Sequence, residues 1–505
     1  MKRISLIFVL LITLLLTACK EEIQTNITAT IEDINISYNS VSFDVNIVDP
    51  DQEITGEVVV YLYTDAGNLR TQKTLTENAE TVTFSSIEPN TVFTIRVIAT
   101  AGRDSIEVKR VKVTTLEETA VVIRTPEDFF AMTNNRSGRF ELGQDIDFTD
   151  VEFESPFGTA ARGFSGEFDG KGYTLKNITF NKITQYTAVF GYLTSGKIKN
   201  LTLENITIGT EDEPLSMSTS TRVGIVYAHS TSEASLVEDV TVKNASIVFQ
   251  SSSTLKVTVG GIAGESRGSI KNVKFIDSLI HVKTTSSADV QIGGIVGLQT
   301  NTAKLKQAYT NSDIYFTALG TQPRNDSVNH VIGGVTGQLA DGGALSELIN
   351  EGNLHLDIKY PTRDATTKAT YTLFAGGLVG KANSRILDGY FSGNLTLTHD
   401  HDQSDENIYK QFRVGGLIGF YEKNIAATRL VYLNGTMTFM LSDDVNHELS
   451  QTFGFDRFKA TSNSGVYGTQ HLTLNDVSIV DQDDVNEILD LTDYFNSEWV
   501  NSYLE

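Results

Sequence analysis

The sequence predicts an all-β protein, a right-handed parallel β-helix (solenoid) with an N-terminal β-sandwich. Two observations favour the solenoid. A glycine-rich hexapeptide recurs at a spacing of about 40 residues, within the range of roughly 20–50 that is typical of stacked repeats, and two further strand-like pieces follow it. The sandwich is favoured by the segment before the repeats, which alternates apolar and polar residues with the period of two that marks half-buried strands.

The chain begins with a signal-like segment. Lys2 and Arg3 precede an apolar run of about 13 residues, which is shorter than the roughly 20 that a membrane-spanning helix needs. The run ends in Leu16-Thr17-Ala18-Cys19, and Cys19 is the only cysteine of the chain. A single cysteine has no partner for an internal disulfide, so another role is indicated for it.

Leu-Thr-Ala-Cys resembles the bacterial lipobox. The resemblance implies that residues 1–18 are a lipoprotein signal peptide, that cleavage occurs before Cys19, and that Cys19 is lipidated. Two or three acyl chains anchor a protein stably to a bilayer. We therefore expect a cell-membrane location, lipid-anchored on the extracytoplasmic face, with residues 19–26 as a polar tether. An ordinary signal peptide with an incidental cysteine is the alternative.

Residues 27–117 are expected to form the sandwich. Val41, Phe43, Val45 and Ile47 alternate with polar residues, and Asp65-Ala66-Gly67-Asn68 is typical of a hairpin turn. The stretch Ile87–Phe93 resembles the fibronectin type III segment that leads into strand F, with Phe93 at the position of the usual corner tyrosine. The resemblance implies a fibronectin type III-like domain.

Residues 118–160 are expected to supply a capping helix and a leader to the solenoid. Thr125 is a predicted N-cap, Pro126 suits the first helical position, and Phe129, Phe130 and Met132 would form the apolar face. Asp145-Ile146-Asp147 is expected to turn the chain. At the other end, residues 481–505 are expected to form an amphipathic capping helix, because a solenoid end exposes unpaired strand edges.

Residues 161–480 are expected to form the β-helix. Gly261, Gly294, Gly334, Gly377 and Gly416 occupy equivalent positions and are predicted to be successive neighbours in one sheet, about 4.8 Å apart. Two other repeat positions carry turn-forming residues, which tolerate a left-handed backbone. The first set is Asn177, Asn200, Asp239, Asn272, Gln307, Glu347 and Asp388, and the second is Asn205, Asn244, Asp277, Asn311, Glu351, Ser392 and Asn434.

Several repeats are lengthened by inserts, and such inserts usually cluster on one face of a solenoid. The longest are residues 209–222, 320–330, 360–370 and 398–410. Because binding residues concentrate on loops held by a rigid scaffold, the inserts are the expected interaction elements.

The repeats resemble the GLUG-motif family, with Gly416-Leu417-Ile418-Gly419 as a core copy and Phe164–Asn177 similar to the segment that precedes such repeats. This resemblance implies a surface-exposed β-helix, similar to bacterial adhesins and to the non-catalytic β-helical region of IgA-cleaving metallopeptidases. It carries no active site to this chain.

The formal net charge of −23 disfavours nucleic acid and anionic head groups as partners. The sequence has no phosphate-binding loop and no Gly-x-Ser-x-Gly elbow, so no cofactor and no catalytic residue are assigned. In His447-Glu448-Leu449-Ser450-Gln451, a glutamine replaces the second histidine of a zinc peptidase motif, and the context is loop-like.

Two acidic stretches contain potential metal ligands: His399–Asp402 with Asp405 and Glu406, and Asp49–Glu53. Neighbouring residues of one loop rarely converge on one ion, so solvated acidic loops are the favoured interpretation and no metal site is assigned. His229, His281, His330 and His355 stand singly and are expected to be exposed or structurally satisfied.

We therefore expect a non-catalytic surface protein that adheres to a host or cell-surface protein or glycan, or has a structural role at the surface. Two alternatives remain open. A β-helical enzyme acting on polysaccharide would need carboxylates gathered on one face. An accessory protein to a secreted peptidase would need only a docking surface.

Overall fold

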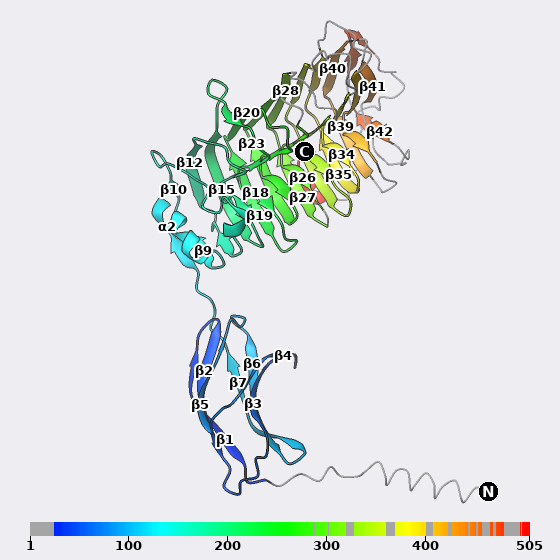
Figure 1. The fold of residues 1–505 in the computed structure, drawn as a ribbon. Helices are drawn as coiled ribbons and strands as arrows, with labels where there is room; N and C mark the ends of the chain where they lie inside the picture. The colour runs from blue at the N-terminus through cyan, green and yellow to red at the C-terminus, as the bar shows by residue number, and fades with distance from the viewer. Residues whose placement is uncertain are drawn as a thin grey trace, which may run out of the picture. The chain divides into compact units, whose positions relative to one another are not determined.

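The computed structural model describes residues 25–285, 288–300, 302–319, 328–359, 369–399, 408–422, 427–442, 445–450, 453–456, 465–467, 471–478, 495 and 497–504 (Figure 1). The signal segment 1–18 and Cys19 therefore lie outside the described residues. The chain divides into two compact units, residues 1–119 and 120–505.

The first unit is a β-sandwich of two antiparallel sheets, as predicted. Its inner face buries Val41, Phe43, Val60 and Val97 almost completely. The turn Asp65–Asn68 joins two strands, and Gly67 adopts a φ of 83° there, a backbone conformation that favours glycine. Within residues 25–119 the sheets have the orders β1-β2-β5 and β4-β3-β6-β7, with β1 Thr28–Ile36, β2 Ser40–Val48, β3 Val58–Thr64, β4 Leu69–Thr74, β5 Ala79–Ser85, β6 Val92–Ala101 and β7 Asp104–Thr114.

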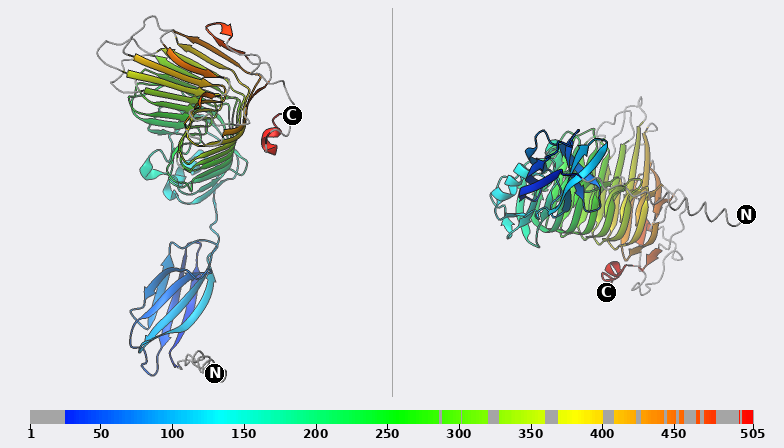
Figure 2. Two further views of the ribbon diagram at one scale, coloured as in Figure 1. Left: turned by 90° about the vertical axis from the view of Figure 1, so that its right-hand side faces the viewer. Right: turned by 90° about the horizontal axis from the view of Figure 1, so that it is seen from below.

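The second unit is a parallel β-helix, which confirms the predicted fold class. One complete coil consists of β21 (Val257–Gly260), β22 (Ala263–Ser266), β23 (Ser269–Ile276) and β24 (Leu279–Thr284). Each of these strands pairs in parallel with its counterpart in the next coil. Figure 2 shows the successive coils stacked along the axis of the solenoid.

The described strands of the second unit, including those of this coil, form three sheets. The first small sheet contains β13 Tyr186–Thr187, β17 Thr221–Gly224, β21, β25 Val290–Gly293, β29 Val328–Gly333, β33 Ala369–Gly376, β37 Ile408–Gly415 and β41 Val445–Ser450. The second small sheet contains β14 Tyr192–Leu193, β18 Tyr227–Ser230, β22, β26 Val296–Gln299, β30 Thr336–Leu339, β34 Val379–Ala382, β38 Ile418–Tyr421 and β42 Phe453–Asp456.

The third sheet, called the large sheet, receives two strands from each complete coil. It contains β8 Val121–Ile123, β9 Arg139–Leu142, β10 Ile146–Asp147, β11 Glu167–Asp169, β12 Thr174–Phe180, β15 Lys197–Ile208, β16 Leu215–Met217, β19 Leu236–Lys243, β20 Ser246–Ser251, β23, β24, β27 Lys304–Thr310, β28 Asp313–Leu319, β31 Ala344–Asn350, β32 Leu354–Lys359, β35 Arg385–Phe391, β36 Leu395–His399, β39 Ala427–Leu433, β40 Thr436–Leu441, β43 Gly465–Tyr467, β44 His471–Leu474 and β45 Val477–Ser478.

The repeated glycines stack as predicted, but they form a corner rather than part of one sheet. The N–H of Gly261 donates to the carbonyl of Gly294, and the N–H of Gly294 donates to that of Gly334, each at 3.1 Å. Gly260 ends β21 and Ala263 begins β22, so the chain turns between the two small sheets at this point. A Cβ on Gly334 would overlap the carbonyl oxygen of Gly377, which explains the need for glycine.

The turn-forming residues stack in two columns, with one correction to the prediction. Asn272 Nδ2 donates to Asp239 Oδ1 at 2.5 Å, within the first column. Asn177 belongs to the second column, because Asn205 Nδ2 donates to Asn177 Oδ1 at 3.0 Å and the strands on either side pair accordingly. A positive φ occurs in the first column at Asn200, Asp239, Asn272, Gln307, Glu347, Asp388 and Arg429, and in the second at Asn177, Asn205, Asn244, Asp277 and Asn434.

A short helix lies against the first coil, as expected. The Thr125 hydroxyl accepts from the N–H of Asp128, and the Asp128 carboxylate accepts from the N–H of Thr125, both at 3.2 Å. This capping box begins α2 (Pro126–Ala131), which is followed by η1 (Met132–Asn135), while η2 (Ala160–Arg162) lies in the leader. Phe129 is fully buried against a cluster of rings from the leader and first coils, namely Phe130, Phe148, Phe153, Phe168 and Phe190.

The described end of the chain contacts the outer side of the large sheet (Figure 2, left). Helix α3 spans Glu498–Asn501, and Val500 is fully buried. The Tyr503 ring stacks on Tyr309 with centroids 4.9 Å apart. These residues therefore pack on the side of the solenoid and not at its end, where a cap was expected. Residues 481–494 of the expected helix lie outside the described part of the chain.

Candidate functional site: a polar face of the large sheet

One outward column of the large sheet brings three aromatic side chains together. Along β24, β28 and β32, residues alternate between the core and the surface, so that Ile280, Val282 and their equivalents are buried while every second residue faces outward. The strand register places His281 opposite Tyr315, and Tyr315 opposite His355, in consecutive coils. All three side chains are half-buried.

The Tyr315 and His355 rings stack face to face, and the His281 ring is tilted by 42° against Tyr315. The centroids of Tyr315 and His355 are 4.4 Å apart with 15° between the planes, and those of His281 and Tyr315 are 5.6 Å apart. His355 Nδ1 lies 3.0 Å from Thr396 Oγ1, and His281 Nε2 lies 3.1 Å from Thr317 Oγ1. Because Tyr315 and His355 cover each other's ring faces, they offer ring edges and polar atoms to a ligand.

The first insert, residues 209–222, contributes Glu211 to this face. Glu211 Oε1 lies 2.5 Å from His281 Nδ1, and Oε2 accepts from Lys283 Nζ at 3.1 Å. Burial acts to raise the pKa of Glu211, but the hydrogen bonds from His281 and Lys283 outweigh it and lower that pKa. Burial lowers the pKa of His281 despite the nearby carboxylate, so at neutral pH the imidazole is uncharged and Glu211 is ionised.

Two recesses open on this side of the large sheet. One has a volume of about 460 Å³ and is lined by Glu211, Ser278, Leu279, His281, Asp313 and Tyr315. The other, nearer the first coil, has a volume of about 820 Å³ and a lining that includes Asn177, Thr179, Asn205 and Thr207.

The strand register links the two recesses. Thr179 aligns with Thr207, Thr207 with Ser246, Ser246 with Leu279 and Leu279 with Asp313. We call the outward surface formed by this column and by the column of His281, Tyr315 and His355, together with Glu211, the polar face.

Hydrogen bonds within the protein already hold part of the polar face. Asp313 Oδ1 accepts from the backbone N–H and the side-chain Nδ2 of Asn353, both at 2.9 Å, and Asn394 Nδ2 donates to Asn353 Oδ1 at 3.0 Å. This ladder fixes the orientation of each side chain. The hydroxyl, amide, phenol and imidazole groups of the polar face can both donate and accept hydrogen bonds, and its carboxylates accept them.

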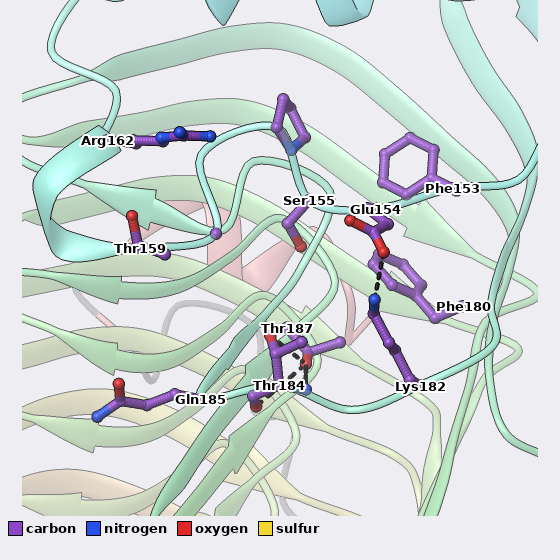
Figure 3. Close-up of a pocket in the computed structure, with 12 residues that line it drawn as sticks. Phe153, Glu154, Ser155, Thr159, Arg162, Phe180, Lys182, Thr184, Gln185 and Thr187 are labelled. Atoms are coloured by element: carbon purple, nitrogen blue, oxygen red, sulfur yellow. Dashed lines mark hydrogen bonds and ion pairs between the residues drawn. The ribbon is translucent and has the colours of Figure 1, made fainter.

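A third recess, of about 340 Å³, lies beside the first coils (Figure 3). Lys182 forms an ion pair with Glu154 at its rim, and the Thr184 N–H donates to Thr187 Oγ1 at 2.8 Å. Figure 3 shows Arg162 on the far side of the recess from Lys182. Lys182 and Glu154 neutralise each other, which leaves Arg162 as the remaining charged side chain in the lining of this recess.

The outward side chains of the two small sheets contact each other across the glycine corner. Arg222 Nε donates to Glu265 Oε2 at 2.6 Å, and the Phe374 and Phe420 rings stack with centroids 4.9 Å apart. Phe420 is only 7% exposed although it points away from the main core. This corner is therefore filled by the protein itself, which leaves the polar face as the better candidate for ligand binding.

The motifs singled out in the sequence lie apart from one another. His447 and Glu448 are in strand β41, so the expected loop context is wrong; Glu448 Oε2 accepts from Arg413 Nε at 2.5 Å, and Gln451 lies outside the described residues. His399 is buried, with Nδ1 2.7 Å from Ser442 Oγ, while Asp400–Glu406 lie outside the described residues.

The acidic residues of the remaining motifs hold turns. Asp49 accepts from the backbone N–H groups of Glu53 and Ile54 at 2.9 Å, and Asp147 accepts from Thr149 and Asn177. Across the described part of the chain, no group of three or more His, Cys, Asp or Glu side chains is placed to hold a metal ion.

Comparison with known proteins gives little further information. No protein-family model matches the chain, and no curated protein matches it. Among solved structures, a computationally redesigned β-sandwich protein is similar, with 24% identity over 19% of this chain and 94% of that chain and a TM-score of 0.15. No helix among the described residues is long and apolar enough to cross a membrane.

Proposed function

We propose that this protein is a lipid-anchored extracytoplasmic surface protein that binds a cell-surface or host molecule without catalysis. The main observation behind this proposal is that three of the inserts join the same two kinds of strand. Residues 320–327, 360–368 and 400–407 each connect the large sheet to the first small sheet, whereas residues 209–214 of the first insert join β15 to β16 within the large sheet. Because these strands stack in register, the ends of the inserts line one edge of the solenoid, here called the insert edge.

The first insert contributes to the polar face. Glu211 comes from the first insert and contacts His281 and Lys283 on β24. Loops that vary while their scaffold stays fixed are typical of binding proteins. The resemblance of the repeats to the GLUG-motif family of surface proteins and the lipobox-like Leu16–Cys19 support the proposed location.

The chain offers its own short connections as matched controls for these loops. Residues 252–256, 285–289 and 442–444 join equivalent strands in other coils without a long insert. In one variant, residues 400–407 are replaced by a copy of residues 285–289; in a control, residues 252–256 are replaced by the same copy.

We expect the first replacement to weaken adhesion of protein-coated beads to a panel of bacterial and animal cells at least threefold, and the control to leave adhesion unchanged. Circular dichroism checks that both variants keep their strands. Unchanged adhesion after replacement of each of the three inserts 320–327, 360–368 and 400–407 would remove the basis of the proposal.

The lipid anchor is tested separately. Cys19→Ser should move the protein from the detergent-rich phase to the aqueous phase in a detergent partition experiment, because the thioether-linked acyl chains can no longer form. Retention of the variant in the detergent phase would contradict the assignment of Cys19.

A further inference from the structure

We propose that the polar face binds an extended, uncharged glycan, with the sugar chain laid along the solenoid axis. This inference rests on the proposed binding function and names the class of ligand. The polar face lies in the interior of the large sheet. The large sheet continues on both sides of β24 and β28, so these strands have neighbours for their backbone hydrogen bonds and present side chains alone to a ligand.

The chemistry of the face matches a ligand rich in hydroxyl groups. Within one recess, Ser278, Asp313, Tyr315 and Glu211 bring together hydroxyl, phenol and carboxylate groups. In the larger recess, Thr179 and Thr207 supply hydroxyl groups, and Asn177 and Asn205 supply amide groups. Hydroxyl, phenol and amide groups both donate and accept, and carboxylates accept, so together they supply the partners that a sugar hydroxyl requires.

The charge of the face argues against an anionic ligand. Glu211 is ionised, and its pKa is lowered by the His281 and Lys283 hydrogen bonds, while Asp313 lies in the same recess. Lys283 is already paired with Glu211 at 3.1 Å. The formal net charge of −23 adds repulsion over longer distances, so a sulfated or uronic acid-rich chain would be opposed.

A peptide ligand is less well suited to this surface. Peptides commonly bind by adding a strand to a free sheet edge or by placing apolar side chains in a groove. The polar face lies in the interior of a sheet, and of the residues lining its smaller recess only Leu279 is aliphatic. A glycan needs neither a free edge nor an apolar groove.

The repeat of the solenoid also suits a linear glycan. Adjacent strands lie about 4.8 Å apart, which is close to the length of one sugar ring. Polar positions recur along one column of the sheet, namely Thr207, Ser246, Asp313 and Asn353, with Leu279 between Ser246 and Asp313. A chain laid along the axis therefore meets hydrogen-bonding side chains in most of these coils.

Tyr315→Phe gives a sharp test, because it removes the phenol oxygen and keeps the ring that stacks on His355. Glu211→Gln is a second variant, which removes the charge and keeps the shape. Tyr38→Phe serves as the matched control, since Tyr38 is 39% exposed and belongs to the first unit.

The full-length protein is run in native gels that contain galactomannan, dextran, pullulan or mixed-linkage β-glucan, and in gels that contain alginate. We expect retardation by at least one of the four neutral polysaccharides. Tyr315→Phe and Glu211→Gln should each weaken that retardation about tenfold, which is the effect of losing a hydrogen bond to a charged or well-placed group. Tyr38→Phe should not change it.

Three results would overturn the proposal: no retardation in any neutral gel, retardation by alginate alone, or retardation by a neutral polysaccharide that both face variants leave unchanged. The bead adhesion experiment separates this inference from the proposed function. Adhesion that depends on the inserts, without glycan binding, would refute the ligand class and leave the binding function standing.

Discussion

At the residue scale, the glycine corner shows how tightly backbone packing limits the side chain. Gly334 lies between Gly294 and Gly377, and the N–H of Gly294 donates to its carbonyl at 3.1 Å. The recurrence of Gly-Gly predicted the stacking of these residues. It did not predict the corner, because a glycine pair is equally typical of a tight turn and of a close approach within one sheet.

Gly334→Ala should destabilise the β-helix by about 2 kcal/mol or more, because its Cβ would overlap the Gly377 carbonyl and the Asn350 amide. Gly158→Ala is the control, since the nearest atom to its Cβ would be the Ser155 carbonyl oxygen at 3.2 Å, and it should cost less than about 1 kcal/mol. Urea denaturation followed by circular dichroism measures both; equal midpoints for the two variants would contradict the steric argument.

His330 makes stability depend on pH. It is buried next to Phe316, with ring centroids 4.8 Å apart, and burial lowers its pKa to about 3 from the usual 6.5. Between these values the unfolded chain binds a proton that the folded chain does not, so stability falls as the pH drops from 6.5 towards 3, by up to about 1.4 kcal/mol per pH unit.

His330→Leu should remove this pH-dependent loss of stability. As the pH falls from 6.5 towards 3, the unfolding free energy of the variant should therefore rise relative to that of the parent. Urea midpoints at pH 7, 5.5 and 4.5 measure the shift. A constant difference at all three pH values would show that the depressed pKa of His330 does not act on stability.

At the element scale, the capping box of α2 and the two turn columns could be predicted because each depends on local chemistry repeated along the chain. The misplaced Asn177 has a specific cause. Strand β15 is long enough to pair with β11 through its first half and with β12 through its second half, so Asn177 of β12 lies opposite Asn205 and not Asn200. The sequence spacing alone does not show this change of partner.

The aromatic column of the polar face was missed for a similar reason. His281 and His355 stand alone in the sequence, yet each lies in an equivalent strand, with Tyr315 between them. Alignment of the outward positions of the second large-sheet strand in each coil would have found the column. The contact with Glu211 could not have been found in this way, because it depends on how the insert folds over the strand.

The lateral packing of α3 gives an optical test at this scale. Trp499 is the only tryptophan, and its ring centroid lies 5.0 Å from that of Tyr503. Val500→Asp should release residues 495–504 from the large sheet, because a buried charge without a partner is costly. We expect a red shift of tryptophan emission and stronger quenching by iodide.

Ser502→Asp is the matched control, since it adds the same charge at an exposed position of the same segment. It should leave the emission maximum where it is. A red shift of equal size in both variants would mean that charge in the segment, and not burial of Val500, determines the fluorescence.

At the scale of the whole molecule, the two units have separate hydrophobic cores. The core of the first unit includes Val41, Phe43 and Phe93, and a different cluster extends through the β-helix. The sequence predicted both units because period-two alternation and a repeat of about 40 residues are signals of whole domains. Location and partner remain proposals, because they depend on chemistry outside these cores.

Residues 25–119, expressed alone, should fold to a monomer with a single cooperative thermal transition, since the sandwich completes both of its sheets without the second unit. Differential scanning calorimetry of this fragment and of the full chain tests the expectation. A fragment without a heat-absorption peak would show that the sandwich needs the β-helix in order to fold.

The insert edge has a consequence for the history and the use of this scaffold. Connections there range from residues 442–444 to residues 360–368, while the strands that they join keep their register. Length and sequence at this edge can therefore change independently of the packed interior. A lineage can acquire a new binding specificity there by insertion or deletion. A protein engineer can graft foreign loops into several consecutive coils, and the grafted loops would then be spaced by the distance between neighbouring strands.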